Sequence, residues 1–473
     1  MRSQKVVLSS HGTYQTPCPS GMLKAWRRPS AEGGLRKVRK RPWLLGLCAL
    51  LLLAVSGCGR PAAAKPHGVL PSARKTTPGG SWELAIVRQG NLYLVTKPGG
   101  PEIRLTRGLS ASHPLFSPDG RYIAFMSGSA TAPSPQYRLG IVGTNGKGLE
   151  LLKPGTGVLP GDYAWSPTQD TLAVWGQGLA LLHPGGSPTI AAGTKGIIGT
   201  FAWAPGGQGY AYTVMPPAKD FPGASDTLWA VSSGKTPHLL ATAPTASGLE
   251  LQGYWPSGQG LLYWIDPLHS ASLAADGLGL ESLPLGGGAQ RSLATTLPYP
   301  SWVQPDGRES ILLVAGPGRQ TWTEKALERC DPVSGTCSVL QTGAGQVALD
   351  PAGTSSGWIA WVGAKDLGRS AWSEVSSLAS LDRWERTRAL YVGFDGKGAS
   401  QATLVAKGSV FDPEFSPDGQ SLLYVQAGAI RLWRSGHGSL LLAKLPAAAV
   451  LDYYGYRDYG QVFAWYPGAP RQP

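Results

Sequence analysis

The sequence predicts an all-β protein built as a β-propeller of eight four-stranded blades, with seven blades as the alternative. Three observations lead to this prediction: a turn-containing unit that recurs about every 50 residues, the composition, and a last copy of the unit at the C-terminus. Only 15% of residues are charged, and 65 Gly and 40 Pro accompany 42% hydrophobic residues and 17 Trp. Glycine and proline in such company mark turns between buried strands.

The recurring unit consists of a bulky apolar residue, a small residue, proline, turn residues and then an apolar strand. Its prolines lie between 38 and 66 residues apart, a spacing that suits one four-stranded blade per unit. The eight copies are Phe116–Phe125, Trp165–Pro167, Trp203–Gly207, Tyr254–Gly258, Trp302–Gly307, Leu349–Gly353, Phe415–Gly419 and Trp465–Gly468.

The residue types of the unit have physical reasons. Proline presets φ for a tight turn, aspartate bonds back to the backbone, and glycine supplies a positive φ. The large residue two positions before the proline is expected to pack between neighbouring blades. Trp302 is displaced by one position, which predicts a distorted blade there.

The two fullest copies, Phe116–Phe125 and Phe415–Gly419, contain Ser-Pro-Asp-Gly, which an apolar strand follows. They resemble the repeats of TolB-like β-propellers, the WD40-like PD40 group, and the resemblance covers residues 82–467. It implies the propeller fold and says almost nothing about function.

The two ends of the chain are expected to share one blade. The last copy leaves almost no chain to finish a blade, while residues 84–87, 91–95 and 103–105 supply three strands without a first one. One C-terminal strand joined to these three would close the ring and remove exposed sheet edges. Counting this shared blade gives eight; the number is seven if the weak copy at 349–353 is a decoration.

The N-terminal segment 1–57 is interpreted as a secretory signal of the lipoprotein type. A basic run at 36–41 precedes a short apolar run that ends in Val55–Cys58. This ending resembles the bacterial lipobox, which predicts a lipid on Cys58. The alternative is an uncleaved signal anchor, although the apolar run is short for a membrane span of about 20 residues.

Residues 58–80 are rich in Pro, Ala and Lys and are expected to form a flexible tether to the propeller, which spans 81–473. Fourteen of the 42 basic residues and one of the 29 acidic residues lie before position 81, which leaves 28 of each in the propeller. The folded part is therefore near neutral, and the formal charge of +13 does not support a nucleic-acid partner.

Two cysteines, Cys330 and Cys337, remain in the propeller with a turn sequence between them. The turn places them near each other on adjacent strands, which predicts a local disulfide in an oxidising compartment. A metal pair is disfavoured because no His or further Cys lies nearby to complete a site. No metal and no cofactor are expected.

One face of the predicted propeller carries enlarged loops, which connect the second and third strands of several blades. Loops on a rigid scaffold often carry function, so this loop-bearing face is the predicted binding face. The loops are 127–136, 216–226, 266–277, 316–324 and 363–387, the last being an insertion.

The insertion contains an amphipathic helical pattern at 370–384 that Ser370 can cap. One hypothesis makes this helix a partner-docking element with Trp372 and Trp384 as anchors. The alternative, which we favour, is a lid packed on its own propeller. The aromatic segment Tyr453–Tyr459 either lines a groove or, as we favour, packs against the closing blade.

The sequence contains no evident catalytic set. Gly353–Gly357 matches the G-x-S-x-G nucleophile pattern, but a strand follows it where a nucleophile elbow needs a helix. Carboxylates such as Asp226, Asp266 and Asp366 lie in the long loops, and nothing in the sequence shows that they converge.

These observations favour a non-enzymatic, monomeric scaffold, anchored by its lipid at the outer face of a cell membrane, that binds an envelope protein or peptide. The alternative is an enzyme acting on cell-envelope carbohydrate or another envelope substrate, with carboxylates placed around the central channel.

Overall fold

The structure is a computed structural model of the chain, and its described residues begin at Trp82. The predicted signal 1–57, the tether 58–80, Cys58, Ser370 and Trp372 lie outside the described residues. The described ranges are 82–128, 138–152, 160–191, 196–217, 220, 223–307, 309–340, 343–354, 356–369, 375, 377–394, 402–446, 450 and 452–468.

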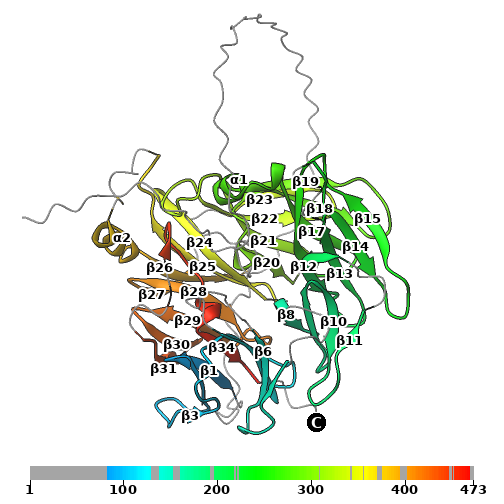
Figure 1. Ribbon diagram of the computed structural model, residues 1–473. Coiled ribbons are helices and arrows are strands. Elements are labelled where there is room, and N and C mark those ends of the chain that lie inside the picture. The colour runs from blue at the N-terminus through cyan, green and yellow to red at the C-terminus, as the bar shows by residue number, and fades with distance from the viewer. Residues whose placement is uncertain are drawn as a thin grey trace, which may run out of the picture.

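Eight four-stranded antiparallel sheets follow one another around a ring, so the fold is an eight-bladed β-propeller (Figure 1). The first four blades, each from its inner to its outer strand, are β34 (Phe463–Tyr466), β1 (Glu83–Arg88), β2 (Asn91–Val95), β3 (Ile103–Arg104); β4 (Ala111–Phe116), β5 (Tyr122–Ser127), β6 (Arg138–Gly143), β7 (Glu150–Leu151); β8 (Pro160–Trp165), β9 (Leu172–Gly176), β10 (Gly178–Leu182), β11 (Thr189–Ile190); and β12 (Ile197–Trp203), β13 (Tyr210–Met215), β14 (Thr227–Val231), β15 (His238–Thr242).

Blades 5 to 8 follow the same order. They are β16 (Gly248–Tyr254), β17 (Gly260–Asp266), β18 (Leu278–Pro284), β19 (Arg291–Thr296); β20 (Val303–Asp306), β21 (Ser310–Ala315), β22 (Ala326–Asp331), β23 (Thr336–Val339); β24 (Gln346–Gly353), β25 (Trp358–Lys365), β26 (Ala389–Phe394), β27 (Thr403–Lys407); and β28 (Val410–Phe415), β29 (Ser421–Gln426), β30 (Ala429–Arg434), β31 (Gly438–Lys444). The predicted number of eight is confirmed, because the segment at 349–353 belongs to a complete blade.

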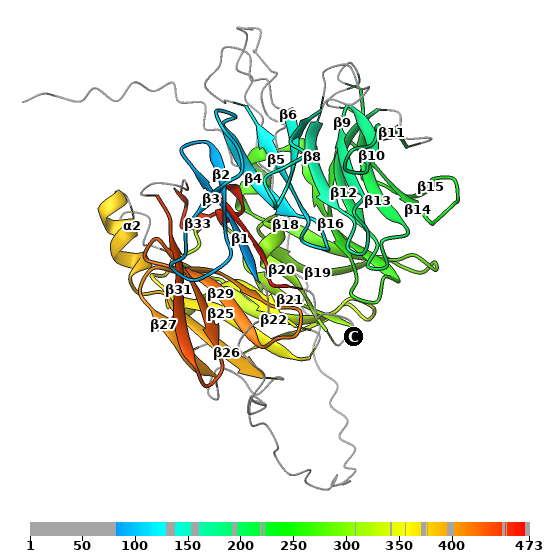
Figure 2. The same ribbon diagram turned by 90° about the horizontal axis from the view of Figure 1, so that it is seen from below.

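The C-terminal strand closes the ring. β34 pairs antiparallel with β1, with Trp465 opposite Leu84, and Figure 2 shows the two strands side by side although they come from opposite ends of the chain. The predicted closure by one C-terminal strand and three N-terminal strands is therefore confirmed. Hydrogen bonding between the two ends leaves no free edge between the first and last blades.

The hydrophobic core lies between neighbouring blades, as the repeat unit predicts. Trp165 donates its indole Nε1–H to the carbonyl of Leu115 at 3.0 Å, and Trp203 donates in the same way to Ala164 at 3.0 Å. Each indole thereby joins the inner strand of its own blade to the inner strand of the preceding one. Burial of the rings and a satisfied N–H both favour this arrangement.

Two copies of the unit differ from the prediction. Pro305 and Pro351 lie inside the inner strands β20 and β24, whereas we expected both to open turns. The turn of blade 7 comes later, where the N–H of Thr354 bonds to the carbonyl of Trp358 at 2.9 Å. Spacing alone could not distinguish a turn proline from a strand proline a few residues earlier.

Several inner strands carry a β-bulge, and three of the bulges share a non-glycine residue with positive φ that precedes a proline. His113, Asp350 and Asp412 have φ values of 52°, 45° and 51°, and a proline follows each of them. The pairing register shifts at each of these places, in β4, β24 and β28. A bulge re-aims the side chains of a strand, here on the strands that surround the channel.

The loop-bearing face follows from the topology. Connections from second to third strands lie on the same face as connections between blades, because every strand reverses direction. This face carries the 3-10 helices η2 (Pro267–His269) and η3 (Pro300–Trp302) and the helices α1 (Ala271–Asp276) and α2 (Leu378–Glu385). Helix α2 begins later than predicted, since Ser377 caps it by accepting a hydrogen bond from the N–H of Ser380.

The connection from blade 8 back to blade 1 also lies on the loop-bearing face. It contains a two-stranded hairpin, β32 (Asp452–Tyr453) with β33 (Tyr456–Arg457), followed by the 3-10 helix η6 (Tyr459–Gln461). We call residues 452–457 the roof hairpin.

A disulfide joins Cys330 to Cys337, which lie directly opposite each other on β22 and β23. The carboxylate of Glu328 lies nearby, but the two sulfurs are bonded to each other and offer no thiolate to a metal ion. Within the described ranges, no helix is long and apolar enough to span a bilayer.

Candidate functional site

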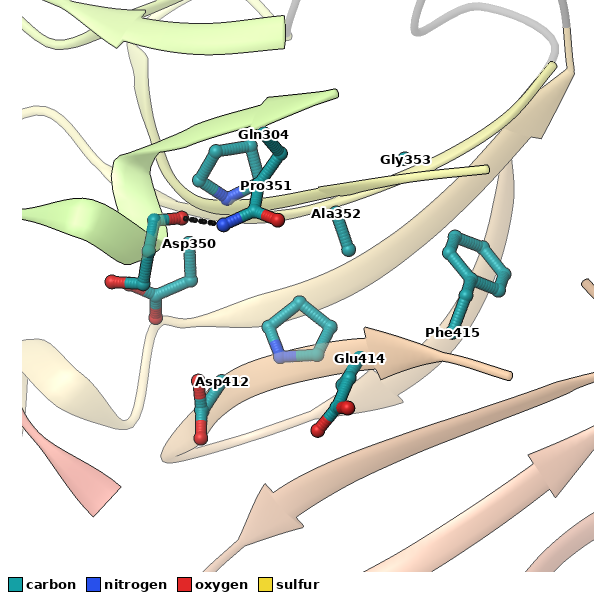
Figure 3. Close-up of a pocket in the computed structure, with 10 residues that line it drawn as sticks. Gln304, Asp350, Pro351, Ala352, Gly353, Asp412, Glu414 and Phe415 are labelled. Atoms are coloured by element: carbon teal, nitrogen blue, oxygen red, sulfur yellow. Dashed lines mark hydrogen bonds between the residues drawn. The ribbon is translucent and has the colours of Figure 1, made fainter. Parts of the chain in front are cut away.

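An acidic cavity of about 300 Å³ lies against the inner strands of blades 6, 7 and 8. Figure 3 shows Asp350 on β24 and Asp412 and Glu414 on the neighbouring β28, all placed around the same hollow. We call this cavity the acidic chamber. The residues that line it are Ser301, Gln304, Asp350, Pro351, Ala352, Gly353, Asp412, Pro413, Glu414 and Phe415.

Asp350 is held in place by three donors. The indole Nε1 of Trp302 donates to its Oδ1 at 3.2 Å, and Nη1 of Arg388 lies 3.5 Å from its Oδ2. The backbone N–H of Asp412 is a third donor to this carboxylate. Burial raises the pKa of Asp350, while Arg388 and the two other donors oppose that rise.

Asp412 and Glu414 differ from Asp350 because neither forms an ion pair in the described part of the chain. Burial raises the pKa of Asp412 well above its usual range, and the charges of Asp350, Glu414 and Asp458 raise it further. Burial raises the pKa of Glu414 to about 7. The side chain of Glu414 is nevertheless exposed to water within the channel, and that of Asp412 is half-buried.

The roof hairpin covers the chamber on the loop-bearing face. The ring of Tyr456 stacks on that of Tyr299, with centroids 3.8 Å apart and planes 9° apart, and its hydroxyl lies 3.2 Å from Oγ of Ser301. The hydroxyl of Thr321 donates to the carbonyl of Tyr454 at 2.9 Å. The hairpin thus reaches from the last blade across to blade 6.

A second charged cluster fixes the hairpin, and its members are paired. Both carboxylate oxygens of Glu385 accept from Arg457, each at 2.9 Å. Arg388 is 1% exposed; it donates Nη2 to the carbonyl of Gly455, and its guanidinium lies 4.8 Å from the ring of Trp384 and 4.2 Å from that of Phe411. We call Glu385, Arg388 and Arg457 the roof cluster.

The predicted anchor Trp384 belongs to this packing. It is 3% exposed, and its Nε1 donates to the carbonyl of Lys365 at 2.8 Å. The centroid of its ring lies 5.9 Å from that of the Trp322 ring. Trp384 is therefore enclosed by residues of its own propeller, and its role as a partner anchor stays a prediction. The aromatic segment Tyr453–Tyr459 likewise packs on its own propeller.

The structure answers the question of convergence for the loop carboxylates. Asp226 and Asp266 come together with Glu250 and His269 between blades 4 and 5, and burial raises the pKa of Asp226 to about 6 and that of Glu250 to about 7. Asp366 is not part of this group; its Oδ1 accepts from the N–H of Gly368 in a local turn.

Asp350, Asp412 and Glu414 are not among the site residues that the sequence predicts. The signal that points to them is an Asp-Pro pair, Asp350-Pro351 and Asp412-Pro413, at equivalent places in two consecutive inner strands. The equivalence becomes visible only when Pro351 is placed inside β24 and not in a turn. The chamber as a whole can neutralise a positive charge or, since its carboxyls have raised pKa values, exchange protons near neutral pH.

No family model matches the chain, and no curated protein matches it. Its structure is similar to dipeptidyl peptidase 4 of Porphyromonas gingivalis, with 10% identity and a TM-score of 0.51, over 78% of this chain and 58% of that one. A eukaryotic initiation factor is similar at 14% identity and a TM-score of 0.47, over 84% and 89% of the two chains. Acylaminoacyl peptidase of Pyrococcus horikoshii is similar at 12% identity and a TM-score of 0.43, over 71% and 52%.

The chain therefore spans between 52% and 58% of the length of these two peptidases. At such low identity the likeness shows the β-propeller fold and nothing about activity.

Proposed function

We propose that this protein is a lipid-anchored, extracytoplasmic binding protein whose channel captures a positively charged group of a peptide or protein partner. The observation that carries the proposal is the acidic chamber, in which Asp412 and Glu414 face a cavity without an ion-pair partner among the described residues. The charges of Asp350, Glu414 and Asp458 raise the pKa of Asp412, so a bound cation would relieve the repulsion among these carboxylates.

The size of the chamber limits the ligand. A volume of about 300 Å³ accommodates one side chain or a chain terminus, and not a folded domain. The ligand group that fits is therefore a lysine ammonium, an arginine guanidinium or an N-terminal amine presented on a loop or tail. Charge-assisted hydrogen bonds from such a group to two carboxylates would give both affinity and orientation.

The location part of the proposal rests on the sequence. A basic run, a short apolar run and Val55–Cys58 together support export and lipid attachment at Cys58. Residues 58–80 would then tether the propeller to the outer face of the membrane. Globomycin treatment of cells producing the full chain, which blocks lipoprotein signal cleavage, would leave the precursor uncleaved, and so would Cys58→Ser.

The binding proposal is tested with short fluorescent peptides in pairs that differ only in lysine against norleucine. The full chain should bind the lysine peptide, and Glu414→Gln and Asp412→Asn should each weaken binding by about tenfold or more. Asp382→Asn, which changes an exposed carboxylate on α2, is the matched control and should bind as the unaltered chain does. Equal affinity for the lysine and norleucine peptides would refute a cation-binding chamber.

The same carboxylates favour a second candidate function, a hydrolase acting on cell-envelope substrates. A carboxyl group whose pKa is raised to about 7 beside a second carboxyl can act as a general acid near neutral pH. Incubating the full chain with purified envelope glycan and peptide fractions distinguishes the two functions. New products that disappear with Glu414→Gln would establish the enzyme, whereas saturable peptide binding without products would establish the binding protein.

A further inference from the structure

Four groups of metal-ligand type gather between blades 4 and 5, away from the acidic chamber. Asp226 precedes β14, Glu250 lies on β16, Asp266 ends β17, and His269 lies in η2. Asp226 is 3% exposed, Asp266 is 8% exposed, and the side chain of His269 is 10% exposed. Three carboxyl groups and one imidazole in a nearly dry place require charge compensation.

Asp226, Asp266 and His269 all lie close to Gly248. Gly248 lies opposite Asp266 in the β16–β17 pairing, and the N–H of its neighbour Leu249 donates to Oδ2 of Asp226 at 3.0 Å. A Cβ added at Gly248 would lie 2.9 Å from Nδ1 of His269 and 3.6 Å from Oδ2 of Asp226. The missing side chain at Gly248 is what allows the imidazole to enter the group.

The second carboxylate oxygen of Asp226, Oδ1, is buried and lacks a hydrogen-bond donor within the described ranges. It faces Nε2 of His269 at 3.8 Å, which is too long for a hydrogen bond. Two ligands of one zinc ion, each at about 2.0–2.2 Å, lie about 3.4 Å apart at a tetrahedral angle and at most about 4.2 Å apart. The 3.8 Å separation falls within that interval.

The turn that carries the imidazole is strained. Leu268 and His269 are consecutive non-glycine residues with φ values of 61° and 47°. Such backbone persists where the surroundings hold it, and it concentrates at binding and catalytic sites. Here the strained turn directs His269 inward toward the two buried aspartates.

We propose that Asp226 and His269 are two ligands of a divalent transition-metal site between blades 4 and 5. No three ligand atoms of these four residues lie within 4.8 Å of one another, so the third ligand requires a side-chain rotation. Asp266, through the oxygen that the N–H of Ser270 does not use, or Glu250 would supply it by rotating toward the ion. One imidazole with carboxylate oxygens suits Zn²⁺ or Mn²⁺ rather than a soft metal ion. The ion would join η2 to the start of β14 and thereby hold two neighbouring blades together.

The experiment titrates the untagged full chain, first stripped of metal with EDTA, with ZnCl₂ and separately with MnCl₂ in a calorimeter. We expect one saturable site for at least one ion and a rise of the unfolding temperature on its addition. Asp226→Asn and His269→Gln should each weaken metal binding by about tenfold or more. Asp226→Asn keeps a side-chain oxygen that can accept the hydrogen bond from the N–H of Leu249. His437→Gln, at an exposed histidine, is the control that should leave the affinity unchanged.

Saturable binding that survives both Asp226→Asn and His269→Gln would overturn the proposal, as would the absence of saturable binding by either ion. Circular dichroism shows whether each variant is folded. A spectroscopic readout on the unaltered chain avoids variants altogether: Co²⁺ bound by nitrogen and oxygen ligands should give visible d–d absorption that Zn²⁺ abolishes. Absence of that absorption at saturating Co²⁺ would equally count against the site.

Discussion

The roof cluster and the acidic chamber lie side by side on blades 7 and 8, yet they differ in whether their charged side chains form ion pairs. In the roof cluster, Glu385 binds Arg457 through both oxygens, and Arg388 lies against Asp350. In the chamber, Asp412 and Glu414 form no ion pair among the described residues. The two regions differ in whether each charge has a partner, and they differ in burial too, since Glu385 and Arg388 are buried while Glu414 is exposed within the channel.

This difference separates structure from function in physical terms. Pairing offsets part of the desolvation cost of a buried charge, and removing one partner of the pair is strongly destabilising. Desolvation raises the pKa of all four carboxyls, but cations oppose the rise at Asp350 and Glu385, whereas no cation opposes it at Asp412 and Glu414. Changes in the roof cluster should therefore affect folding, and changes in the chamber should affect binding while folding persists.

The largest effect is expected for Arg388→Met. This variant leaves Asp350 without its counter-ion and the carbonyl of Gly455 without its donor, and it removes the contacts with Trp384 and Phe411. The free energy of unfolding, measured by urea denaturation, should fall by about 3–5 kcal/mol.

Arg386→Met, at an exposed arginine of the same segment, is the matched control and should change the free energy of unfolding by less than about 0.5 kcal/mol. Equal effects of the two substitutions would show that the Arg388–Asp350 contact does not hold the roof, and the contrast between the two regions would lose its basis.

A smaller effect is expected from a double-mutant cycle on Glu385 and Arg457. The side chain of Glu385 is 4% exposed and that of Arg457 is 22% exposed, so solvent screens their two hydrogen bonds only in part. Glu385→Gln, Arg457→Met and the double variant should give a coupling energy of about 1–3 kcal/mol in urea denaturation. A coupling near zero would place this pair with ordinary surface ion pairs.

The ring could be predicted from sequence because its signals are local. Proline, aspartate and glycine make a turn wherever they occur together, and the strand that follows needs only apolar residues. Closure followed from an unfinished blade at each end of the chain. The disulfide between Cys330 and Cys337 is local too, since a single turn separates them.

The chamber could not be predicted because it depends on register. Asp350 and Asp412 enter it through β-bulges, and a bulge of one residue changes which side chains face the channel. The same limit applies to Asp226 and His269, which meet only because two blades pack at Gly248. Trp384 shows the reverse case: its helical pattern was visible, but its burial depends on the distant Trp322.

The smallest and most diagnostic effect concerns Glu414. Its pKa in the folded chain, about 7, lies above the ordinary value of 4.5. Between these values the folded chain keeps a proton that the unfolded chain has released, so stability falls as the pH rises through this window. Glu414→Gln removes that loss. The variant should unfold at the same temperature as the unaltered chain at pH 4 and about 1–2 °C higher at pH 8, a gain kept small because water reaches this side chain.

Differential scanning calorimetry at the two pH values measures this difference directly. Asp382→Asn alters an exposed carboxylate on α2, so the temperature gap between this variant and the unaltered chain should not depend on pH. A pH-independent gap for Glu414→Gln as well would mean that Glu414 titrates as a solvated carboxyl does. The ionised chamber would then carry no unfavourable electrostatic free energy that a cationic ligand could relieve. The roof cluster and the chamber would differ only in packing.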